Sequence, residues 1–130
     1  MTASDPVVIV GVGLTPVGEH WQTSLRSLGL QALEAARREA PDLQPGALYV
    51  ANMLAPTLSG QAHLGALLAD FAGLRGIEAV TVEAAGASGG LALRQAEPPA
   101  VVVDHDGDVV GVVEGGGAGL EGGVVKLPLR

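Results

Sequence analysis

The chain has 130 residues, a mass of 13.0 kDa and a formal net charge of −7. Its length suits one domain, and a hydrophobic fraction of 48% excludes a generally disordered chain. The acidic balance, without clustered lysine or arginine, argues against nucleic acids and anionic membranes as partners. No cysteine is present, which excludes disulfides and thiolate metal sites.

The first six residues and the length of the apolar runs indicate the cellular location to expect for the protein. Residues 1–6 contain Asp5 and lack the basic stretch that opens a signal peptide. No run of about 18 uninterrupted apolar residues occurs, so no transmembrane helix is expected. We therefore expect a cytoplasmic protein.

Predicted strands and helices alternate over the first three quarters of the chain. Short apolar runs predict buried strands at residues 7–10, 48–53 and 77–82. Apolar residues at helical spacing predict helices over residues 25–40, 64–71 and 87–96. Ser24 is a candidate N-cap of the first helix, and Pro41 ends it. This βαβαβα order predicts an α/β fold with parallel strands and right-handed connections.

The composition changes after Pro99. The next residues are almost all Ala, Val, Gly, Asp and Glu. Residues 100–103 and 109–113 predict a hairpin, because Asp-Gly between them favours a tight turn. The glycine-rich stretch 114–123 is expected to be loose, and no fourth strand of the α/β pattern is recognised. We therefore divide the chain into residues 1–97 and an irregular Gly/Val-rich tail, residues 98–130.

Three patterns suggest ligands but have simpler interpretations. Gly11-Val12-Gly13 lacks the third glycine of a dinucleotide fingerprint, so a strand-to-loop turn is preferred. Asp104, Asp106 and Asp108 lack the glycine and glutamate positions of a calcium loop, so a solvated turn is preferred. The histidines, His20, His63 and His105, are far apart in sequence, and no metal site is expected.

Residues 83–90, Glu-Ala-Ala-Gly-Ala-Ser-Gly-Gly, carry more information. They lie where a predicted strand passes into a predicted helix. A side chain there faces unpaired N–H groups and the positive end of the helix dipole. A cysteine in such a place has a stabilised thiolate and becomes a nucleophile at neutral pH. By composition alone, the same segment is an ordinary Gly/Ala-rich helix start.

A series of segments between residues 6 and 96 carries a family resemblance. The segments are Val8–Gly13, Gly18–Trp21, Ser24–Arg26, Leu48–Leu54, Ser59–Leu67, Ala72–Gly76, Val82–Ala85 and Ala87–Ala96. In this order and spacing they resemble the start of bacterial thiolases of the sterol-carrier-protein-linked branch, which are acyl-CoA acyltransferases. The resemblance implies part of a thiolase-like layer with a mixed sheet.

The resemblance also places Gly86 at the position of the family nucleophile, the cysteine that takes up the acyl group from coenzyme A. Glycine has no side chain, so no competent catalytic residue is expected. Ser88 is a poor substitute, because two residues along a helix turn a side chain about 200° away. The family's second half, which supplies a histidine and a second cysteine, has no counterpart in these residues.

These observations predict a thiolase-family acyltransferase fragment that is itself inactive. Two alternatives stay open: a non-catalytic subunit that pairs with a complete thiolase, and an unrelated small α/β binding domain. Coenzyme A thioesters are the implied family substrates, and no bound cofactor is expected. The expected partners are a second copy or a thiolase-family protein, because the strand at residues 77–82 lies at the dimer interface of thiolases.

Overall fold

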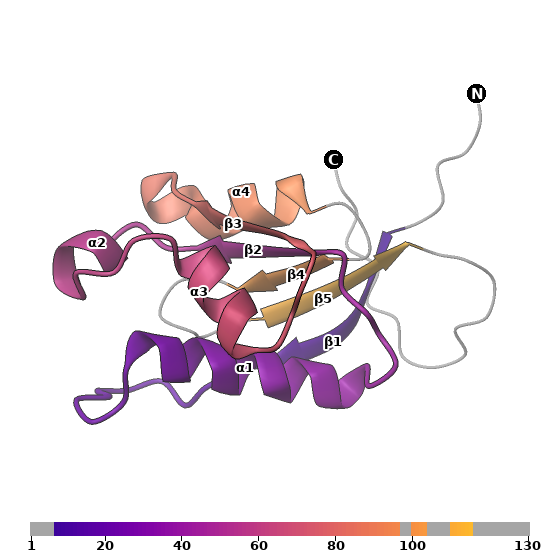
Figure 1. Ribbon diagram of the computed structural model, residues 1–130, viewed down its shortest axis with the longest axis horizontal. Helices are drawn as coiled ribbons and strands as arrows, with labels where there is room; N and C mark the ends of the chain where they lie inside the picture. The colour runs from indigo at the N-terminus through magenta and orange to yellow at the C-terminus, as the bar shows by residue number, and fades with distance from the viewer. Residues whose placement is uncertain (1–6, 97–99, 104–109, 116–130) are drawn as a thin grey trace.

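Figure 1 shows the computed structural model, which describes residues 7–96, 100–103 and 110–115. The elements are β1 (Val7–Gly13), α1 (Leu25–Glu39), β2 (Ala47–Ala51), α2 (Ala55–Leu58), α3 (Leu64–Phe71), β3 (Glu78–Val82), the 3-10 helix η1 (Ala85–Ala87), α4 (Ser88–Gln95), β4 (Ala100–Val103) and β5 (Val110–Gly115). The strands form one mixed sheet in the order β1-β5-β4-β2-β3. β5 is antiparallel to both of its neighbours, and β2 is parallel to β3 and β4. The predicted α/β class is confirmed.

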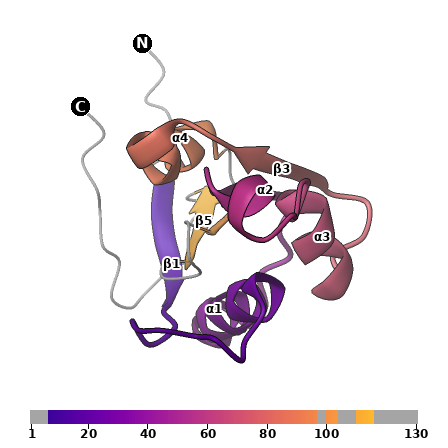
Figure 2. The ribbon, with the colours of Figure 1, turned by 90° about the vertical axis from the view of Figure 1, so that its left-hand side faces the viewer.

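The helices cover the two faces of the sheet (Figures 1 and 2). α1 and α3 pack on one face, and α4 packs on the other, over β2, β3 and β4. β2 is buried along its whole length, and its side chains alternate between two clusters. Leu48 and Val50 pack with Leu33 on the face of α1 and α3. Ala47, Tyr49 and Ala51 pack on the face of α4. The core therefore has a layer on each side of β2.

Helix α1 confirms the prediction from the sequence. The Ser24 hydroxyl accepts a hydrogen bond from the Ser27 N–H at 3.2 Å, so it caps the helix as expected. The helix ends at Glu39, two residues before Pro41, which cannot donate a backbone hydrogen bond. Leu33, on its apolar face, is 1% exposed. Burial of such a side chain contributes about 1.5–3 kcal/mol.

The Gly-Val-Gly segment has a packing role. The expected turn at this point is wrong, because β1 continues through Gly13. A Cβ atom on Gly11 would lie 2.5 Å from the Ala36 carbonyl oxygen of α1, and one on Gly13 would collide with the Ala32 carbonyl oxygen. Glycine therefore allows α1 to approach the backbone of β1 closely.

Residues 100–103 were predicted as part of a hairpin but were not recognised as the fourth strand of the sheet, and the tail has regular structure over residues 100–103 and 110–115. β4 follows α4 and lies in the sheet beside β2, with Val102 and Val103 buried. The predicted hairpin is confirmed, because β4 pairs antiparallel with β5 and Val103 lies opposite Val110. The position of a valine-rich strand in a sheet depends on the strands beside it, and the local sequence does not specify which strands these are. The boundary proposed between residues 97 and 98, and most of the segment 114–123, lie outside the described residues.

Candidate functional site

The loops that follow the parallel strands lie together at one edge of the sheet, the edge formed by the carboxyl ends of these strands. β1 is parallel to β4, because both are antiparallel to β5, and β4 is parallel to β2. β1, β2 and β3 therefore all end at the same edge, on the left in Figure 1. The connections that follow are residues 14–24, 52–63 and 83–87. Ligands of open α/β sheets bind at this edge.

The turn between β3 and α4 lies at this edge and contains Gly86. Ala85 has a positive φ of 48°, which is rare for a residue with a side chain. Its N–H donates to the Glu83 carboxylate (Oε1) at 2.7 Å. The Ala87 N–H donates to the Ala84 carbonyl oxygen at 2.9 Å. Hydrogen bonds on both sides of Gly86 thus define the course of the backbone.

Gly86 is exposed and lies two residues before the first residue of α4. A Cβ atom added there would meet no described atom within 4 Å. Its φ also lies outside the left-handed region, so an ordinary L-residue fits the backbone. The turn therefore has room for a side chain at the start of the helix. That Gly86 occupies the position of a family nucleophile stays a prediction.

Ser88 has a structural role in the same turn. It is 3% exposed. Its hydroxyl donates to the Ala85 carbonyl oxygen at 2.7 Å and accepts from the Ala84 N–H at 2.9 Å. Both hydrogen bonds hold the 3-10 turn closed. A buried hydroxyl whose proton is committed to a backbone carbonyl is a poor nucleophile, since attack needs a free lone pair and an adjacent base.

The histidines are not brought together. His20 Nε2 donates to the Pro16 carbonyl oxygen at 2.7 Å, in the loop after β1. His63 precedes α3 with a φ of 54° and is exposed. His105 lies outside the described residues, as do Asp104, Asp106 and Asp108 of the acidic cluster. Within the described ranges, no three His, Asp or Glu side chains form a group that could hold a metal ion.

Among the described helices, none combines the length and the apolar character that a membrane-spanning helix requires.

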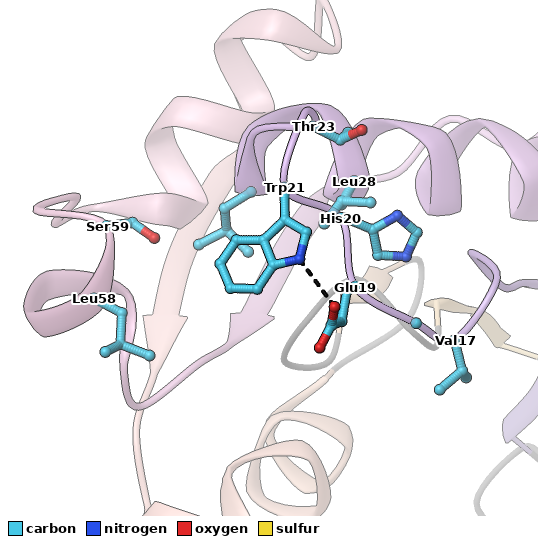
Figure 3. Close-up of a pocket in the computed structure, with 10 residues that line it drawn as sticks. Val17, Glu19, His20, Trp21, Thr23, Leu28, Leu58 and Ser59 are labelled. Carbon is cyan, nitrogen blue, oxygen red and sulfur yellow. Dashed lines mark hydrogen bonds between the residues drawn. The ribbon is translucent and has the colours of Figure 1, made fainter.

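A pocket that the sequence analysis missed lies at the same edge (Figure 3). Its volume is about 610 Å³. The lining residues come from the loop after β1, the first turn of α1 and the end of α2: Val17, Gly18, Glu19, His20, Trp21, Thr23, Leu25, Leu28, Leu58 and Ser59. The side chains of Trp21 and Leu58 stand at its rim, 83% and 74% exposed.

Leu58 and Ser59 line this pocket from the end of α2, a short helix that was also not predicted from the sequence. The strand expected over residues 48–53 ends at Ala51. Asn52 then turns the chain, and its Oδ1 accepts from the N–H groups of Leu54 at 2.9 Å and Ala55 at 2.6 Å. Asparagine favours such local turns. Asn52 followed by proline at position 56 was the available signal for a short helix.

Comparison with known proteins finds relatives for most of the chain. No family model matches it. It is 48% identical over 94 residues to an acetyl-CoA acetyltransferase of Methanocaldococcus jannaschii, a match that covers 69% of this chain. It is 48% identical over 92 residues to an acetyl-CoA acetyltransferase of Methanothermobacter thermautotrophicus, covering 68%. The chain spans about a quarter of the length of these relatives, 24% in each case.

A solved structure shares the fold. The 3-oxoacyl-[acyl-carrier-protein] synthase III of Aquifex aeolicus VF5 superposes with a TM-score of 0.66 at 18% sequence identity. The match covers 87% of this chain and 55% of that protein. It extends beyond the 69% covered by the sequence relative. The chain therefore has a thiolase-like α/β fold, and most of its length is similar in sequence to acetyl-CoA acetyltransferases.

Proposed function

We propose that the chain is a segment of a thiolase-family acyltransferase in which the nucleophile is missing. The similarity to acetyl-CoA acetyltransferases and the thiolase-like fold support the family. One observation carries the proposed loss of activity: the turn before α4 has room for a side chain, and Gly86 provides none. Membership of the sterol-carrier-protein-linked branch and a cytoplasmic location stay predictions.

The missing group matters because the family reaction begins with covalent capture of the acyl group. A cysteine thiolate attacks the thioester carbonyl, a new sulfur–carbon bond forms, and coenzyme A leaves as its thiolate. Gly86 offers no atom for this attack. The Ser88 hydroxyl lies in the same turn, but it already donates to the Ala85 carbonyl oxygen. No acyl-enzyme is therefore expected from this turn.

The test is thiolysis of acetoacetyl-CoA by the purified chain in the presence of coenzyme A. We expect no turnover above that of a heat-denatured sample. Activity that stays with the chain through purification, and disappears when the chain is unfolded, would contradict the proposal.

A second candidate, a non-catalytic subunit, is favoured by the two outermost strands of the sheet, β1 and β3, each of which has one side without a neighbouring strand of the described sheet. In the outermost strand β1, the Val12 N–H donates to the Glu39 carboxylate (Oε2) at 2.8 Å. This N–H is therefore not free to pair with another strand. At the β3 edge, the Glu78 N–H and the Val82 carbonyl oxygen both point to the segment that contains β2. Because backbone groups alternate along a strand, those of Ala79 and Thr81 point outward. An unprotected edge of this kind favours pairing with another strand.

The self-association predicted here is tested with Ala79→Pro, measured by light scattering. Proline removes an outward N–H without removing a hydrogen bond to β2. We expect the wild type to be a dimer or larger species and Ala79→Pro to be smaller, with an unchanged circular dichroism spectrum. A wild type that stays monomeric at all concentrations would exclude pairing of the chain with a second copy.

A further inference from the structure

The pocket between the loop after β1 and the end of α2 has an apolar base and an apolar rim. Leu28 at its base is 8% exposed, whereas Val17 and Leu58 at its rim are 82% and 74% exposed. Large apolar side chains gathered around one hollow are typical of binding sites. A volume of about 610 Å³ lies in the range of pockets for small molecules or single side chains.

One wall of the pocket carries a carboxylate in contact with an indole ring. Glu19 Oε2 accepts a hydrogen bond from Trp21 Nε1 at 3.0 Å, which orients the ring (Figure 3). No described residue donates a hydrogen bond to the other carboxylate oxygen, Oε1. Trp21 remains 83% exposed despite this bond. The wall therefore offers a negative charge and an exposed aromatic surface side by side.

We propose that this pocket binds an alkylammonium group. The ammonium lies against Glu19 and the ring of Trp21, and the alkyl arm lies along Leu28 and Leu58. Cations are attracted to the face of an indole, and an adjacent carboxylate adds a charge-assisted hydrogen bond. An anionic ligand meets repulsion from Glu19 and from a chain of net charge −7.

The other polar groups of the pocket agree with this ligand class. His20 Nε2 is already bonded to the Pro16 carbonyl oxygen. Arg26, on the first turn of α1, lies with its Cζ 4.0 Å from the centre of the Phe71 ring, outside the pocket lining. Glu19 is thus the acidic side chain of this lining. The same ligand chemistry occurs in free amines and in the lysine side chain of a polypeptide.

Trp21 makes the proposal testable, because it is the single tryptophan of the chain. Its emission would be followed while the wild-type chain is titrated with hexylamine, hexanol or hexanoate at pH 7 and constant ionic strength. These probes share an alkyl arm and differ in charge. We expect hexylamine to bind roughly tenfold more tightly than hexanol, as expected for one exposed ion pair with a cation–π contact. Hexanoate should bind most weakly.

Two variants separate the charge from the apolar contact. Glu19→Gln keeps an acceptor for the indole and should reduce the preference for hexylamine over hexanol to the part that the cation–π contact with Trp21 supplies. Leu58→Ala should weaken both probes while preserving their ratio. Glu34→Gln, an exposed change of the same charge on α1, is the matched control and should behave as wild type.

The source of the amine is distinguished by one more probe, N-acetyl-lysine methylamide. Binding comparable to hexylamine would point to a lysine side chain of a partner, and much weaker binding would point to a free amine. Either result agrees with the ligand class. Equal titration by hexylamine and hexanol, no change in emission with any probe, or the same loss in Glu34→Gln as in Glu19→Gln would overturn the proposal.

Discussion

Replacing Gly86 with cysteine places a thiol at the start of α4. The substitution should leave the fold intact, because an added Cβ atom meets no described atom within 4 Å. Unpaired N–H groups and the helix dipole favour the thiolate there. An exposed charge at a helix N-terminus gains about 0.3–1 kcal/mol. Since one pKa unit corresponds to about 1.36 kcal/mol, the thiol pKa should fall from about 8.5 to about 8.

The assay is the pH dependence of the alkylation rate with iodoacetamide. Gln31→Cys is the matched control, because position 31 is exposed in the middle of α1. Its midpoint should stay near the free-thiol value of about 8.5. Glu83 opposes the effect, as a nearby negative charge disfavours a thiolate, so adding Glu83→Gln to the first variant should lower the midpoint further. A Gly86→Cys midpoint at or above that of Gln31→Cys would refute the reasoning.

Three further predictions concern stability, measured by urea denaturation. Gly13→Ala should destabilise the chain by about 1–3 kcal/mol, because the new methyl group meets the backbone of α1; Gly18→Ala, where an added Cβ has open space, should be nearly neutral. Ser88→Ala should cost about 1–3 kcal/mol, because it removes two hydrogen bonds that each contribute about 0.5–1.5 kcal/mol and leaves the half-buried Ala84 N–H without its acceptor. Leu33→Ala, in the core, should cost about 2–5 kcal/mol. A neutral result at Gly13 or Leu33 would contradict the packing of α1.

Helices α1, α3 and α4 were predictable because their signals are local. Apolar spacing, the Ser24 cap and Pro41 together specify the span of α1 to within about a residue. The same holds for α3, whose observed bounds, Leu64–Phe71, equal the predicted ones. The turn at Gly86 was also placed correctly between a strand and a helix. In each case, the residues that determine the structure are neighbours in sequence.

Apart from α2, whose signal at Asn52 and Pro56 is local, the features that were missed depend on distant residues. β4 was predicted as part of a hairpin, but its place between β2 and β5 depends on residues that are distant in sequence. The pocket needs Trp21 from the loop after β1 and Leu58 from the end of α2, which meet only when the sheet aligns the ends of β1 and β2. Ser88 shows that the position of a residue in an element can be predicted without its side-chain hydrogen bonds. Its helical position was inferred, whereas its two hydrogen bonds occur in a turn whose backbone, with a positive φ at Ala85, was not predicted.

The central claim is that the turn at Gly86 is a nucleophile position without its nucleophile. Intact-mass spectrometry after incubation with acetyl-CoA tests this most directly, with the wild type, Gly86→Cys and Gln31→Cys side by side. We predict that the wild type gains no acetyl group and that Gly86→Cys gains one, faster than Gln31→Cys because more of its thiol is ionised. Acetylation of the wild type within residues 83–88, or equal rates for the two cysteine variants, would contradict the claim.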